Sequence, residues 1–100
     1  MGKPYYADYV NHILRFYFRY DCSKGFKNDV DKTNYLAADK VIRKLSDTDR
    51  QIMCTIFNLD GVNVADNIMV VAKRFHEDHK ALWSLVSTTT AKIAKERKLL

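Results

Sequence analysis

Residues 64–95 read VADNIMVVAKRF, HED, HKALWSLVSTTTAKIAK, which is two helical patterns separated by three residues. In the first pattern, Val64, Ile68 and Val71 recur at the spacing of one face of a helix. The second pattern repeats its apolar residues in the same way, at Leu82, Leu85, Val86 and Ile93. We therefore expect a helix-turn-helix, in which two helices meet at a tight turn and the second keeps one face uncovered.

The side chains around the break suit close packing of the two helices. Ala72 is small enough for a neighbouring helix to approach it, Phe75 would anchor the end of the first helix, and Asp78 can cap the second. Leu82 and Leu85 would hold the second helix against the core. The residues then left on its uncovered face are His79, Lys80, Trp83, Ser84, Ser87, Thr88, Ala91, Lys92 and Lys95.

This face carries short hydroxyl side chains and lysines, whereas an ordinary solvated helix face pairs Glu with Lys. Short side chains let a helix approach the floor of the DNA major groove, and lysines neutralise phosphates. Candidate groove contacts are His79, Lys80, Trp83, Ser84, Ser87 and Thr88. Candidate phosphate contacts are Lys92, Lys95, Arg97 and Lys98. The sequence therefore predicts that the helix after Asp78 binds double-stranded DNA.

Two features of this helix have a second interpretation. The run Ser87–Thr90 has low helix propensity and could end the helix or form a short strand, although Ile93 and Ala94 resume the inward spacing after it. Trp83 can stack on a base or a partner, or it is a half-buried aromatic at the edge of the helix.

Three more helices are predicted before this segment, over about residues 4–20, 32–45 and 46–58. Ser46 and Asn63 have the side chains and positions of N-caps. The stretch 21–31 has no period and is expected to be a loop, with a turn at Asp60-Gly61. With only three Gly and one Pro in 100 residues, we expect an all-α, five-helix single domain. Its aromatic-rich helices would occupy residues 1–45 and the helix-turn-helix region residues 46–100.

The helix expected at residues 4–20 has a broad stripe of aromatic and aliphatic residues. A stripe this wide needs cover from other helices or from a second subunit. A homodimer would use Tyr6, Tyr9, Ile13 and Tyr17. Arg15 and Arg19 lie between these aromatics, which leaves open a site for single-stranded nucleic acid.

The formal net charge is +5, and the basic excess gathers toward the end of the chain. Lys and Arg outnumber Asp and Glu by ten to eight in residues 1–60 and by seven to four in residues 61–100. A basic surface attracts a polyanion such as DNA, and the same charge also favours solubility.

The chemistry of catalysis and of metal binding is not visible in the sequence. The group His76-Glu77-Asp78-His79 lacks the spacing and the further ligands of a zinc site, and the three Gly are too scattered to form a phosphate loop. We expect no enzyme activity, no metal and no cofactor. Cys22 and Cys54 form no disulfide framework, and no apolar stretch suits a signal peptide or a membrane span. A cytoplasmic location is therefore expected.

The stretch 45–53, LSDTDRQIM, resembles the start of the C-terminal DNA-binding domain of bacterial sigma factors. In that family a capped helix with this opening precedes the helix-turn-helix. Residues 71–82 and the basic tail 91–99 are similar to the family's later motifs, so that the likeness covers roughly residues 45–99. His76 stands where the family usually has Gly in the turn. The whole chain looks like the small sigma-like regulators of phages and mobile elements, which implies transcription regulation and RNA polymerase as a partner.

The competing hypothesis is a helical module that dimerises or binds another protein without binding DNA. A measurement of mass in solution with and without duplex DNA, across a salt series, separates the two hypotheses.

Overall fold

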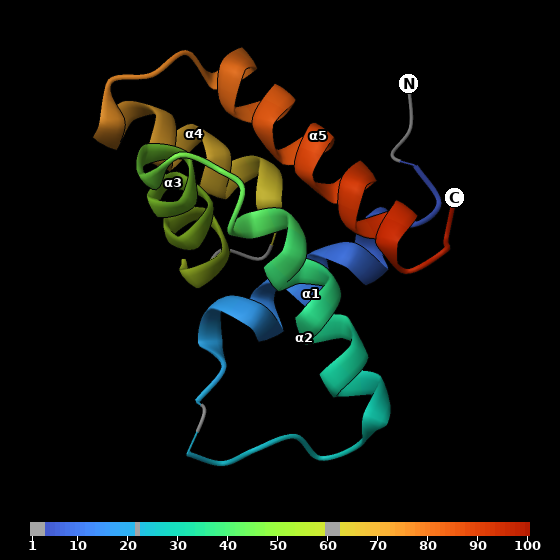
Figure 1. Cartoon of the computed structure of the whole chain (residues 1–100). Helices are drawn as coiled ribbons and strands as arrows, with labels where there is room; N and C mark the ends of the chain where they lie inside the picture. Colours follow the sequence, from blue (N-terminus) through green and yellow to red (C-terminus); the bar gives the residue numbers. More distant parts are fainter. Residues whose placement is uncertain (1–3, 22, 60–62) are drawn as a thin grey trace.

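A computed structural model describes residues 4–21, 23–59 and 63–100 (Figure 1). These residues contain no strand and form five helices: α1 (Ala7–Arg19), α2 (Asp29–Ile42), α3 (Asp47–Asn58), α4 (Val64–Phe75) and α5 (His79–Glu96). The predicted all-α class is therefore confirmed. Cys22 and the expected turn at Asp60-Gly61 lie outside the described residues.

Side-chain caps set the starts of three helices where the sequence predicts them. Ser46, Asn63 and Asp78 each accept a hydrogen bond from a backbone amide in the first turn of α3, α4 and α5, at 2.9 to 3.1 Å. A cap of this kind satisfies an amide that has no partner within the helix and stabilises it by about 1 kcal/mol.

The first two helices have different starts from those expected. α1 begins at Ala7 rather than at Pro4, and the Ala7 amide closes a turn onto the Pro4 carbonyl at 3.0 Å. α2 begins at Asp29 instead of Lys32, because the Asn28 side chain caps it by accepting from the Asp31 amide at 2.9 Å. The irregular segment between α1 and α2 is therefore shorter than the sequence suggests.

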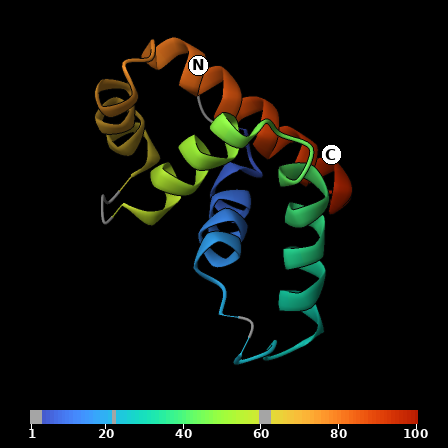
Figure 2. The same ribbon diagram turned by 60° about the vertical axis from the view of Figure 1, so that its left-hand side comes forward.

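α1 lies at the centre of the fold and packs against α2, α3 and α5, while α4 packs against α3 and α5 (Figure 2). The largest fully buried side chains come from all five helices: Val10, Ile13, Leu14, Ile42, Met53, Ile56, Phe57, Ile68, Val71 and Ile93. These residues form one continuous core, which places α5 across the top of the molecule in both views.

The aromatic stripe of α1 is covered largely by the chain itself. Ile13 is fully buried, and the Tyr17 ring packs against Tyr35 of α2 with 4.9 Å between ring centroids. The Tyr17 hydroxyl donates to Asp39 Oδ1 at 2.8 Å. Ile13 and Tyr17 are therefore not available as a surface for a second subunit, and only Tyr9 of the four expected dimer residues is exposed.

α5 is continuous through Ser87–Thr90, so a helix break or a short strand there is wrong. Thr89 is buried, and the Thr90 hydroxyl donates to the Ser87 carbonyl oxygen at 3.0 Å. Because this hydroxyl forms its hydrogen bond within the helix, Thr90 can lie against the core.

Candidate nucleic-acid interface

α5 is fixed by one face, and this decides which residues it presents to solvent. Leu82, Val86 and Ile93 are buried against the core, while Leu85 is half-buried at the edge. A helix anchored along a single face by apolar side chains keeps the opposite face free.

The opposite face of α5 is a stripe of small residues with a lysine at each end. The stripe consists of Lys80, Ser84, Ser87, Ala91 and Lys95, which follow one another at helical spacing. Ala91 is half-buried and the other four are exposed. At 1.5 Å per residue, the α5 stripe spans about 22 Å. Small side chains along its centre leave the helix backbone accessible to a large partner.

The charge on this helix is one-sided. Glu96 is the only acidic residue of α5, and its carboxylate is held at 3.2 Å by Lys40 of α2. Lys80, Lys92, Lys95 and Lys98 are all exposed. The absence of carboxylates along the stripe means that an approaching polyanion meets no local repulsion from α5.

The surface is also hollowed near the end of the helix. Ser87, Thr88, Ala91, Lys92, Lys95 and Leu100 line a depression of about 460 Å³. Thr88 and Lys92 stand beside the stripe, so that hydroxyls and ammonium groups share one concave surface. Such a surface offers donors to phosphate oxygens.

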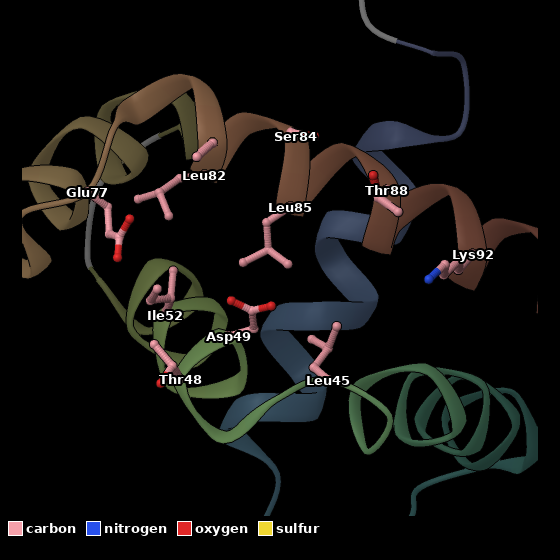
Figure 3. Close-up of a pocket in the computed structure, with 11 residues that line it drawn as sticks. Leu45, Thr48, Asp49, Ile52, Glu77, Leu82, Ser84, Leu85, Thr88 and Lys92 are labelled. Carbon is pink, nitrogen blue, oxygen red and sulfur yellow. The ribbon is translucent and has the colours of Figure 1, made fainter.

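A cavity of about 390 Å³ separates α5 from the start of α3 (Figure 3). Leu85 points from α5 toward Asp49 and Leu45, and Lys92 lies at the far end of the same cavity. Asp49 and Glu77 bring two carboxylates to this side of α5. Ser84, Thr88 and Lys92 line the same cavity, so these two carboxylates stand along one flank of the candidate face. A polyanion therefore approaches more favourably from the other flank, where the stripe carries Ser87, Ala91 and Lys95.

The turn between α4 and α5 is tight although it has no glycine. His76 adopts the left-handed conformation, with φ 55° and ψ 41°. The Glu77 amide donates to the Ala72 carbonyl at 2.9 Å and the His76 amide to the Lys73 carbonyl at 3.4 Å. These two bonds form a Schellman motif, whose left-handed position glycine usually occupies. Lys73 and Arg74, exposed in the last turn of α4, add positive charge beside the turn that the sequence analysis did not include.

Arg97 has a structural partner and differs from the other predicted phosphate contacts. Its Nε donates to Asn34 Oδ1 at 2.6 Å, and Asn34 Nδ2 donates to the Tyr9 hydroxyl at 3.1 Å. The hydrogen bond with Asn34, helped by the nearby Arg97 charge, lowers the pKa of Tyr9. Arg97 is half-buried, so this guanidinium ties the end of α5 to α1 and α2 and does not belong to the exposed stripe.

Two aromatic or imidazole side chains lie beside the stripe instead of on it. Trp83 is 40% exposed and lines a second cavity, of about 610 Å³, with Tyr6 of the N-terminal segment and Val64 of α4. His79 is half-buried, with Nδ1 3.7 Å from Asp78 Oδ1. Trp83 therefore matches the interpretation of an aromatic at the helix edge.

Within the described residues, no three His, Cys, Asp or Glu side chains gather closely enough to hold a metal ion. A search of the same residues for a helix with the length and apolar character of a membrane span finds none.

No protein family, no curated protein and no solved structure matches the chain. The resemblance to sigma-factor DNA-binding domains expected from residues 45–99 has no support from these comparisons.

Proposed function

We propose that this protein binds double-stranded DNA by inserting the α5 stripe into the major groove. The observation that carries the proposal is an exposed helix face with small side chains at its centre, lysines at both ends and no carboxylate along its length. Ser84, Ser87 and Thr88 would meet base edges, because hydroxyls bond to donors or acceptors in the groove. Lys80, Lys92, Lys95 and Lys98 would neutralise phosphates.

The turn at His76 supports the same proposal. The Schellman bonds fix the direction in which α5 leaves α4, and the cap at Asp78 starts α5 at once. A rigid turn keeps the recognition helix of a helix-turn-helix at a set angle to the helix before it. Lys73 and Arg74 at the end of α4 would contact the DNA backbone beside the groove.

The test compares two double variants with the same change in charge. Lys80→Glu/Lys95→Glu reverses both ends of the α5 stripe. Lys24→Glu/Lys27→Glu reverses two exposed lysines between α1 and α2, at the end of the molecule away from α5 (Figures 1 and 2). Affinity for a fluorescent 20-base-pair duplex is measured by anisotropy over a salt series.

The α5 variant should lose at least tenfold in affinity and reduce the salt slope of the binding constant by about two. The other variant should bind the duplex nearly as the unchanged protein does, although its net charge is equally reduced. Equal losses in both variants would show attraction by net charge without a defined site and would contradict the proposal.

We also propose that the protein regulates transcription in the cytoplasm in the manner of a sigma factor, encoded by a phage or a mobile element. Its support is the motif at residues 45–53, whose Ser46 caps α3 as the family motif requires. Such a regulator would bind RNA polymerase as well as DNA. Co-elution with bacterial RNA polymerase on a sizing column tests this part, and separate elution would contradict the polymerase contact while leaving DNA binding intact.

The alternative of a protein-interaction module has one observation in its favour. Met69 and Val70 are adjacent on α4 and are 45% and 47% exposed. Neighbouring exposed apolar side chains are typical of a protein contact. A mass that doubles in solution without DNA, and falls back in a Met69→Ser/Val70→Ser variant, would favour this alternative.

A further inference from the structure

A further concave surface lies at the other end of the molecule from α5. One face of α1 and the segment between α1 and α2 enclose a groove of about 660 Å³. Its functional lining, here called the α1 groove, consists of His12, Arg15, Phe16, Arg19, Lys24 and Lys27. The four residues from α1 recur at helical spacing and so share one face.

The chain folds back to bring the two lysines to this face of α1. Gly25 has φ +66°, a left-handed conformation that costs other residues free energy. An added Cβ there would meet no atom within 4 Å, so the requirement for glycine is conformational and not steric. Gly25 lies between Lys24 and Lys27, and both lysines line the same groove as Arg15 and Arg19 of α1.

The cations of the groove are available to a ligand. Among the described residues, Arg15, Arg19, Lys24 and Lys27 take part in no ion pair within 4 Å. The groove also contains Asp21, but both Ser23 groups bond to its Oδ1, the amide at 2.9 Å and the hydroxyl at 2.7 Å. With Asp31 as the other carboxylate, the groove has an excess of positive charge.

An aromatic wall stands beside these cations. Phe16 lines the groove, and its ring centroid lies 5.7 Å from that of Tyr20. Tyr20 is itself stacked on Phe26 at 4.8 Å with an interplanar angle of 8°, and it packs against Tyr35 at 4.7 Å. This packing holds the wall in place, so the groove offers an apolar surface next to charged side chains.

We propose that the α1 groove binds a nucleoside phosphate, with the base against Phe16 and Tyr20 and the phosphates among the arginines and lysines. Arginine binds phosphate through paired N–H groups, and an aromatic ring stacks on any base. A volume of this size suits a ligand of one nucleotide. The same unit occurs as a free nucleotide or as one residue of a single strand. The proposal is independent of duplex binding by α5.

The experiment measures binding of four probes by calorimetry at fixed ionic strength: ATP, adenosine, tripolyphosphate and the single strand d(A)6. ATP should bind with 1:1 stoichiometry, and adenosine and tripolyphosphate should each bind at least tenfold more weakly. Tripolyphosphate binding as tight as that of ATP would mean attraction of any polyanion and would overturn the proposal, as would no binding of ATP.

Variants locate the site. Lys24→Glu/Lys27→Glu should lower the affinity for ATP at least tenfold. Phe16→Leu should lower the affinity for ATP but not the affinity for tripolyphosphate. Lys80→Glu/Lys95→Glu should leave ATP binding unchanged. ATP binding that survives both groove variants would overturn the assignment. If d(A)6 binds more than tenfold tighter than ATP and its binding is lost in the same variants, the ligand of the groove is a single strand. If d(A)6 and ATP bind equally tightly, the ligand is the free nucleotide. Lys80→Glu/Lys95→Glu is the control for nucleotide binding and the test variant for duplex binding. Failure of one proposal is therefore distinguishable from failure of the other.

Discussion

Arg97 donates its Nε proton to Asn34 at 2.6 Å, joining residues that are 63 positions apart in the sequence. Asn34 is 4% exposed and also bonds to Tyr9 of α1, so one amide side chain connects α1, α2 and the end of α5. The position of α5, on which the proposed function depends, is therefore fixed at its C-terminal end by polar bonds as well as by apolar packing.

Asn34→Ala should destabilise the protein by about 1–3 kcal/mol, because it leaves the half-buried Arg97 without its acceptor. The measurement is urea unfolding followed by circular dichroism. Lys32→Ala, at an exposed position of the same helix, is the matched control and should change the free energy of unfolding by no more than about 0.5 kcal/mol. An Asn34 variant as stable as the control would mean that the network contributes nothing.

His76→Gly should stabilise the protein by about 0.5–1 kcal/mol. The left-handed conformation of a non-glycine residue such as His76 costs about 1–2 kcal/mol of stability. Glycine avoids this strain, but part of the gain is offset because glycine loses more conformational entropy on folding. His79→Gly is the control of opposite sign, since His79 is helical and glycine there should lower stability. If both variants are less stable than the unchanged protein, the turn does not have the conformation described.

The predicted and observed helices agree where a capping residue directly precedes an apolar repeat. Ser46, Asn63 and Asp78 are such residues, and α3, α4 and α5 begin where expected. Asn28 gives the same signal, but it stands within a polar stretch without a period, and α2 was expected only from Lys32. Local signals of this kind are readable because the cap bonds to an amide two or three residues away.

Other features depend on contacts that no local pattern contains. The bond between Arg97 and Asn34 joins distant helices, and the α1 groove needs the reversal at Gly25 to bring lysines beside Arg15 and Arg19. The lysines and serines of the α5 stripe are predictable on an uncovered face, because their position follows from the helical period and from the inward apolar residues Leu82, Val86 and Ile93. Arg97 directly follows α5, one turn after the buried Ile93, so the same helical period already places it on the covered side of the helix.

Removing either N-cap should cost about 1 kcal/mol. Ser46→Ala and Asn63→Ala each remove the acceptor of a first-turn amide, at 3.1 Å from Asp49 and 2.9 Å from Asp66. Ser84→Ala, at an exposed position inside α5, should be neutral or slightly stabilising because alanine has the higher helix propensity. Thermal unfolding of the three variants gives the comparison, and a loss in Ser84→Ala as large as in the cap variants would contradict the cap assignment.

Two tyrosines should give the stability opposite dependences on pH above about 10, the pKa of a free tyrosine. Burial, and then the hydrogen bond to Asp39, raise the pKa of Tyr17. The folded state therefore keeps a proton that the unfolded state releases, and the stabilisation present below pH 10 is lost as the pH rises. In a Tyr17→Phe variant, the free energy of unfolding should decline less between pH 9 and pH 11.

Tyr9→Phe should have the reverse effect. The hydrogen bond with Asn34 lowers the pKa of Tyr9, so ionisation of this residue favours the folded state as the pH rises. In the Tyr9→Phe variant, the free energy of unfolding should fall more steeply at alkaline pH than in the unchanged protein. Urea midpoints at several pH values measure both variants, and identical slopes would contradict both assignments.

The amide spectrum of ¹⁵N-labelled protein, recorded while a duplex is added, tests the central claim most directly. Binding through α5 should shift the amides of Lys80, Ser84, Ser87, Ala91 and Lys95 together, and leave those of Arg15, Arg19, Lys24 and Lys27 in place. Shifts confined to those four groove residues, or an unchanged α5 at saturating duplex, would contradict it.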